Sequence, residues 1–309
     1  MKKLYLILFI FGWPIAAVSC DICGCGAGNN YIGILPEFHK HIVGLRYRFN
    51  RVISHVGVGG AKTPLTTAEQ YNIVEAWGGW NLSDKVRVMT TVPYSFNQKT
   101  NDGGRAYKSG LGDISVFGFY QVLNTRKTVS GKESSRLMVQ SLWLGGGVKL
   151  ATGKYDPTSR QAEAPTANLF QLGTGSYDFN LNAMYDIRLQ DAGLNINGNY
   201  KLNTANQFDY QYGDKASMNA QLYYKFRTKH MIMIAPNAGI QYEHSQTDRD
   251  DNIKVITSGG NLVMGTLGLE TAFGKCAVGA NYQTPLSQSL ARGIVKAENR
   301  WMVHFAIAL

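Results

Sequence analysis

The chain has 309 residues with a net charge of +10, and 44% of its residues are hydrophobic. Lys and Arg residues are dispersed along the sequence, which excludes the clustered basic surface of a nucleic-acid-binding protein. Beyond the N-terminus no run of about eighteen apolar residues occurs, so no transmembrane helix is expected.

Residues 1–19 have the composition of a secretory signal peptide. The basic start Met1–Lys3 is followed by the apolar stretch Leu4–Trp13 and then by the small residues of Ala16–Ser19. We therefore exclude this segment from the fold. It also predicts export, in which case the rest of the chain meets an oxidising compartment.

Residues 20–39 form a Cys-rich segment that we expect to lie in the periplasm or to enter the lumen of the domain that follows. Cys20, Cys23 and Cys25 are spaced so that their thiolates could bind copper or zinc. A disulfide is an alternative, and no second CxxC completes a four-ligand site. Cys20 is also a candidate for lipidation, because the residues before it resemble a bacterial lipobox, although Ala17 stands where leucine is usual.

The rest of the chain, 40–309, alternates between apolar and polar residues with a period of two, which predicts strands. We expect strands at 40–56, 69–82, 85–96, 112–125 and 135–151, two more in a hairpin at 176–203, and then at 215–227, 230–245, 260–273, 275–285 and 298–309.

The hairpin at 176–203 shows the pattern most clearly. In its first strand Phe179 and Leu181 alternate with Asn180 and Asn182. The polar face is rich in Asn, so it is not half of a sandwich core. These strands are also long enough to cross a membrane when tilted. The pattern predicts a wall with lipid on one side and water on the other.

Long and short connections alternate between these strands. We predict that the long ones at 57–67, 97–110, 153–166 and 246–259 face outward, whereas Ser83-Asp84 and Thr228-Lys229 are near the minimum for a hairpin. This pattern is typical of outer-membrane barrels. The predicted fold is all-β: a transmembrane antiparallel up-and-down β-barrel of about twelve strands. A soluble sandwich is the alternative.

The chain ends on an alternating strand, Trp301–Leu309, similar to the C-terminal strand read by the barrel-assembly machinery, although a terminal phenylalanine is more usual. We therefore expect this machinery and outer-membrane lipids as partners, and no nucleic acid.

Several short motifs occur in a fixed order along the chain. They are Thr91–Tyr94, Ser109–Ile114, Gly147–Gly153, Leu172–Asp178 and Asn199-Tyr200. Each is weak alone, but their ordered set resembles the outer-membrane family named for the meta pathway of phenol degradation, a relative of the long-chain fatty-acid transporters. The similarity covers about 40–309, and Ala151 departs from the proline often found in the family. The resemblance implies an outer-membrane channel.

Charged residues on the polar faces of the strands are the candidate lumen and selectivity residues. They are Arg46, Arg48, Glu75, Arg87, Lys149, Asp178, Asp186, Arg188, Lys201, Lys225, Arg227, Glu243 and Glu270. One interpretation is a cross-strand network of salt bridges that holds the shape of the barrel. The other is a selectivity region for anionic or amphiphilic cargo.

No motif of a catalytic or nucleotide-binding site is present, and we predict that the protein is not an enzyme. The sequence favours a bacterial outer-membrane channel or transporter for small hydrophobic or amphiphilic solutes. One alternative is a metal-linked outer-membrane protein that uses the Cys cluster. Another is an outer-membrane hydrolase, for which His244 is the single candidate residue.

Overall fold

Alternation in the sequence gives each strand two different faces. In β7 (Asp178–Leu189) of the computed structural model, the first buried side chains are Asp178, Asn180 and Asn182. Between them Phe179 and Leu181 are about half exposed, at 50% and 58%. Since successive side chains of a strand point to opposite faces, one face of this sheet is polar and enclosed and the other is apolar and open.

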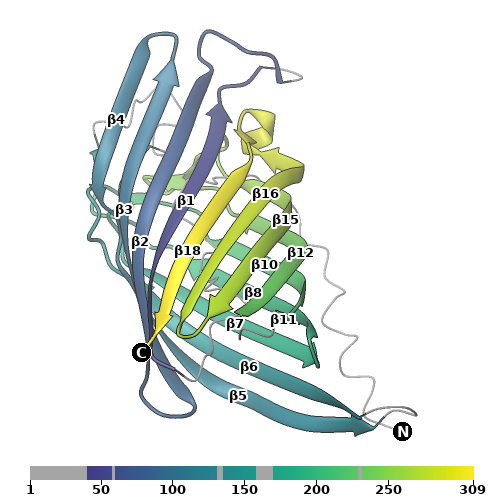
Figure 1. Ribbon diagram of the computed structural model, residues 1–309. Helices are drawn as coiled ribbons and strands as arrows, with labels where there is room; N and C mark the ends of the chain where they lie inside the picture. The colour runs from purple at the N-terminus through teal and green to yellow at the C-terminus, as the bar shows by residue number, and fades with distance from the viewer. Residues whose placement is uncertain (1–39, 58–59, 131–134, 158–169, 229–231) are drawn as a thin grey trace, which may run out of the picture.

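The structure describes residues 40–57, 60–130, 135–157, 170–228 and 232–309. Twelve long strands of this described chain form the wall of a closed antiparallel barrel (Figure 1). With β7 they are β1 (Ile42–Ser54), β2 (Thr67–Asn81), β3 (Val86–Asn101), β5 (Ser115–Ser130), β6 (Ser135–Lys149), β8 (Ala192–Leu202), β10 (Lys215–Tyr224), β12 (Ile232–Ser245), β15 (Gly260–Phe273), β16 (Cys276–Leu290) and β18 (Arg300–Ala308).

Each wall strand pairs with the next one along the chain, and β18 pairs with β1 to close the ring. This arrangement confirms the predicted up-and-down barrel. The register also confirms the predicted inner and outer faces, because Arg46 of β1 lies opposite Glu75 of β2 and His304 of β18. Among the described residues, no helix has the length and apolar character needed to cross a membrane.

The two ends of the barrel differ. At one end, which we call the short-turn end, the turns Gln190–Asp191 and Gly274–Lys275 join adjacent strands, and Gln190 and Gly274 adopt positive φ values of 60° and 58°. The C-terminus lies at this end (Figure 1). The other end, the long-connection end, carries short elements: β9 (Tyr210–Gln211), β13 (Arg249–Asp250), β14 (Ile253–Lys254), the 3-10 turn Ala291–Gly293 and β17 (Lys296–Ala297).

The predicted loop at 97–110 is wrong. β3 continues to Asn101 and turns back as β4 (Gly104–Leu111), so this segment is a hairpin. The lower part of β3, Val86–Thr91, pairs with β5, whereas Tyr94–Asn101 pairs with β4. The strand expected at 112–125 accordingly begins at Ser115. The β3–β4 hairpin stands at the upper left of Figure 1.

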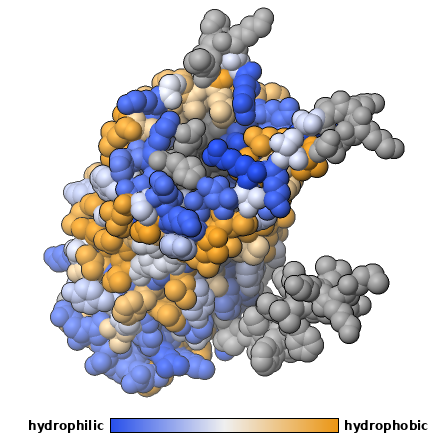
Figure 2. All heavy atoms as spheres, turned by 90° about the horizontal axis from the view of Figure 1, so that it is seen from below, coloured by the Kyte–Doolittle hydropathy of each residue, from blue (hydrophilic) through white to orange (hydrophobic). Residues whose placement is uncertain are grey.

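The outer wall is apolar. Leu222 is 65% exposed and Ile240 is 55% exposed, and both lie on the face opposite the buried polar residues. Figure 2 views the molecule from the short-turn end and shows hydrophobic residues, in orange, on the wall around that end. Apolar atoms exposed over a whole barrel wall fit a hydrocarbon surrounding.

Candidate functional site

The lumen contains a group of ion pairs on β1 and β2, which we call the Arg–Glu ladder: Arg46, Arg48 and Glu75. Arg46 donates from Nε to Glu75 Oε2 at 2.6 Å, and Arg48 Nη2 contacts Glu75 Oε1. All three residues are at most 6% exposed. A buried carboxylate held by two guanidinium groups is compensated, which explains how these charges are tolerated inside the barrel.

A second polar group lies at the long-connection end, and we call it the rim cluster: Asp113, Lys149, Thr174, Ser176, Asp178 and Lys201. Lys149 Nζ is 2.6 Å from Asp113 Oδ2 and 3.0 Å from Asp178 Oδ2. Lys201 Nζ lies 3.1 Å from the same Asp178 oxygen. Ser176 Oγ donates to Asp178 Oδ1 at 2.8 Å. Asp178, which is fully buried, therefore links three neighbours.

The sequence motifs that carried the family resemblance converge on the rim cluster. Asp113 Oδ1 accepts the Gly153 backbone N–H at 2.9 Å, and its Oδ2 accepts the Thr174 N–H at 2.9 Å. A Cβ on Gly173 would lie 2.5 Å from Asp113 Oδ1 and 2.6 Å from the Gly153 carbonyl oxygen. Glycine is required there because the segments after β6 and before β7 pass in direct contact.

A third polar group surrounds Asp186 on β7. Tyr223 donates its hydroxyl to Asp186 Oδ2 at 3.0 Å, and Asn195 donates to the same oxygen at 3.3 Å. Lys225 lies with its Nζ 5.2 Å from the centre of the Tyr223 ring. Arg188, which lies on β7 with Asp186, is half-buried. Tyr223 of β10 thus contacts both Asp186 of β7 and Lys225, the residue that follows β10.

The remaining predicted lumen residues are spread over the wall. Arg87 and Glu270 are buried at 0% and 1% exposure, and Arg87 donates to the Lys40 carbonyl oxygen at 3.3 Å. Glu243 pairs with Arg300 at 2.7 Å. Arg300 was not predicted, although it has the same strand parity as His304, which the alternation places inside. This shared parity was the signal in the sequence from which the inward orientation of Arg300 could have been predicted.

Arg227 is a correction to the predicted lumen set. Its side chain is 62% exposed, and its Nε lies 3.2 Å from Asp191 Oδ1 in the β7–β8 turn. The wall strand β10 ends at Tyr224, and Arg227 belongs to the short β11 (Phe226–Arg227) beyond it. Arg227 therefore lies at the short-turn end, beyond the wall strand, where strand parity no longer directs its side chain into the lumen.

An apolar group inside the barrel was missed from the sequence. We call it the base cluster, and its buried members are Ile42, Trp77, Met89, Phe117, Phe119, Trp143, Met184, Ala277 and Ala306. It lies near the short-turn end of β1, β3, β16 and β18, since Ile42 begins β1 and Ala277 is the second residue of β16. Isolated apolar residues on polar strand faces are weak signals, and only the closed barrel brings them together.

Glycines on β6 make room for the aromatic rings of the base cluster. A Cβ on Gly147 would lie 2.3 Å from Phe117 Cδ1, and a Cβ on Gly145 would lie 2.4 Å from Phe119 Cδ1. The two rings therefore lie flat against the neighbouring strand. A Cβ on Gly44 would similarly lie 2.7 Å from the Trp77 ring. These contacts keep the rings close to the wall.

The two alternative sites predicted from the sequence are the N-terminal Cys cluster and His244. Cys20, Cys23 and Cys25 lie outside the described residues, as does the whole segment 20–39, so their metal binding and the lipidation of Cys20 stay predictions. Among the described residues, no group of His, Cys, Asp and Glu side chains is suited to a metal ion. His244 lies on β12, and its Nδ1 is 2.9 Å from Asn261 Oδ1 of β15.

Comparisons with known proteins agree with this geometry. The family model described as "Putative MetA-pathway of phenol degradation" matches residues 56–261, more than half of the chain. The chain belongs to this family. No curated protein matches its sequence.

A solved structure shows the same fold. The crystal structure of an outer membrane channel from Pseudomonas putida F1 is similar over 92% of this chain and 100% of that chain, with a TM-score of 0.64 and 11% identity. Two weaker likenesses are the translocator domain of the autotransporter NalP from Neisseria meningitidis (TM-score 0.44, 10% identity, 87% and 88% of the two chains) and a Pseudomonas aeruginosa FadL homologue (TM-score 0.32, 13% identity, 86% and 89%). The protein is a β-barrel of the bacterial outer membrane.

Proposed function

We propose that the protein is a channel for small amphiphilic or hydrophobic solutes and that it has no enzymatic activity. The observation that carries the proposal is the division of the lumen into two chemical zones. The Arg–Glu ladder and the rim cluster supply charges, and the base cluster supplies aromatic and aliphatic side chains. An amphiphile has a polar group and an apolar body, so it finds complementary contacts in both zones.

Two further observations support the proposal. The solved structure with the same fold is an outer membrane channel. The alternation of short turns and long connections is that of barrels whose short turns face the periplasm. In this orientation the rim cluster lies nearer the cell surface and the base cluster lies nearer the periplasm.

Reconstitution of the purified protein tests the proposal. In a liposome-swelling assay, benzoate, a small aromatic anion, should enter faster than a neutral pentose of similar size. Phe119→Ala should reduce this preference, because it removes a buried ring of the base cluster. Phe179→Ala is the matched control, since Phe179 is 50% exposed on the outer wall. If no small solute of any kind permeates, the proposal fails.

A further inference from the structure

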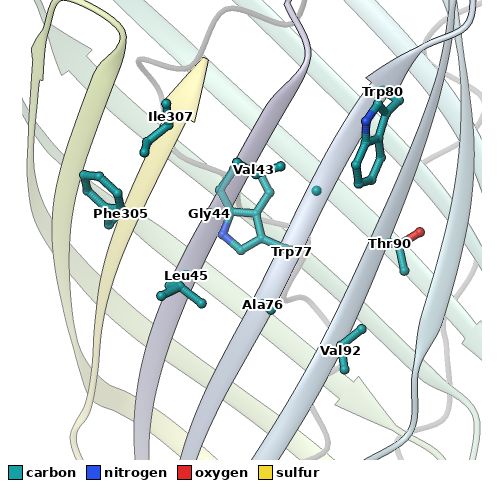
Figure 3. A pocket seen from close by; sticks show the side chains of 11 residues that line it. Val43, Gly44, Leu45, Ala76, Trp77, Trp80, Thr90, Val92, Phe305 and Ile307 are labelled. Carbon is teal, nitrogen blue, oxygen red and sulfur yellow. The ribbon is translucent and has the colours of Figure 1, made fainter. Parts of the chain in front are cut away.

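A groove is present on the outer surface of the barrel, across β18, β1, β2 and β3 near the short-turn end (Figure 3). Its outward-facing walls include Leu45, Trp80 and Phe305, which are 55%, 44% and 38% exposed. Leu45 pairs with Phe305 on one side and with Ala76 on the other. The groove therefore belongs to the membrane-facing wall and not to the lumen.

The groove exists because two small residues, Ala76 and Gly78, follow each other on the outward face of β2 between Val74 and Trp80. Ala76 and Gly78 form the low part of the surface between Leu45 and Val92. The Trp80 ring lies over Gly78, where an added Cβ would be 2.5 Å from Trp80 Cη2. A bulky residue at position 76 would fill the space. The sequence of β2 thus produces a hollow of ≈ 470 Å³, within the range of roughly 300–1,000 Å³ that is common for ligand pockets.

The groove has an apolar part and a polar end. Thr90 provides the one hydroxyl group among the side chains that line it. Beyond Trp80, toward the short-turn end, lies the exposed residue His41. His41 Nδ1 accepts the Asn81 backbone N–H at 3.1 Å, which leaves the ring proton on Nε2. A hydrogen-bond donor therefore lies where the wall meets the membrane interface, the depth at which Trp is enriched.

We infer that this groove binds one phospholipid of the leaflet at the short-turn end, with an acyl chain along Ala76, between Leu45 and Val92, and its phosphate near His41. Three features of the groove fit this ligand: its place on a wall that faces the bilayer, its apolar lining, and its polar end at the interface. A second copy of the chain would have to present a ridge of complementary shape, and it would leave the polar end without a purpose. The inference rests on the location in the membrane and is independent of the proposed channel activity.

Native mass spectrometry of the folded barrel in a short-chain detergent, with added dioleoyl phosphatidylethanolamine, tests the inference. The wild-type protein should retain one phospholipid under activation that removes the others. Ala76→Phe should lower the retained fraction at least about tenfold, because the new ring occupies the groove. Ala280→Phe is the matched control, since Ala280 is exposed on the outer wall of β16 and does not line the groove.

Heat-dependent migration on a gel establishes that each variant is folded. If Ala76→Phe does not fold, Ala76→Leu and Ala280→Leu replace the pair. Equal retention of phospholipid by the wild-type protein and the Ala76 variant overturns the inference. So does an equal loss in the Ala280 variant, which would mean that lipid contacts the whole wall without a preferred site. Dimers that the Ala76 variant abolishes would assign the groove to a second copy instead.

Discussion

The rim cluster and the base cluster stabilise two parts of the same lumen by different physical means. At the rim, buried charges are satisfied by partners from segments far apart in sequence, with Asp178 between Lys149 and Lys201. At the base, Phe117 and Phe119 fit against glycines of β6. The stability of the rim cluster therefore depends on charge and hydrogen-bond geometry, whereas that of the base cluster depends on side-chain volume.

The largest effect is expected from Asp178→Ala. This change removes the shared partner of two buried ammonium groups, and breaking a buried ion pair costs about 3–5 kcal/mol. The free energy of unfolding, measured by urea titration in lipid vesicles, should fall by that amount. Asp156→Ala is the control, because Asp156 is 34% exposed and its 3.3 Å pair with Lys108 should contribute less than about 1 kcal/mol. Equal losses for the two variants would contradict the contrast between buried and exposed charges.

A smaller effect is expected at the base from Gly147→Ala. The added Cβ would lie 2.3 Å from Phe117 Cδ1 and 2.6 Å from the Val116 carbonyl oxygen, so the strand and the ring must move apart. Overpacking of this kind costs about 1–3 kcal/mol. Gly118→Ala is the matched change, since a Cβ at Gly118 has nothing within 4 Å. The same urea titration should show a loss for Gly147→Ala only, and two equal losses would mean that volume at the base is unimportant.

The smallest effect concerns His55, outside β1 at the long-connection end. Burial, and then the charge of Lys99, lower the pKa of His55 below its ordinary value. The unfolded state therefore binds the proton more readily, and stability should fall as the pH drops below about 6.5 toward the lowered pKa of the folded state. We expect a loss of less than about 1 kcal/mol between pH 7.5 and 5.5, because the group is partly exposed. His55→Gln should remove this pH dependence, and an unchanged dependence would assign it to other groups.

The barrel itself could be predicted because period-two alternation sets both the strands and their inner and outer faces. The β3–β4 hairpin was missed because the segment 97–110 is polar on both faces. Its signal was Asp102-Gly103, a dipeptide typical of tight hairpin turns. Strand parity no longer applied where a wall strand ended, as at Arg227.

The candidate site was less predictable than the fold. Parity identified most of the charged lumen residues, but it could not show which of them meet. Lys149 and Asp113 are 36 residues apart in the chain and meet because the pairing of β5 with β6 places Lys149 opposite Ser115. The motif Ser109–Ile114 pointed to Asp113 without giving its role. The base cluster was hidden for the same reason, since contacts between distant strands depend on closure of the ring.

A closed barrel normally has no free strand edge, yet the β3–β4 hairpin restores one. Within the described chain β4 pairs with β3 alone, so the opposite edge of β4 presents backbone N–H and C=O groups to its surroundings. Such edges invite pairing with strands of other molecules, and natural proteins protect them with charged side chains. Arg105 lies exposed on this strand and is suited to that protection. The hairpin that extends the wall therefore also carries its own protection against aggregation.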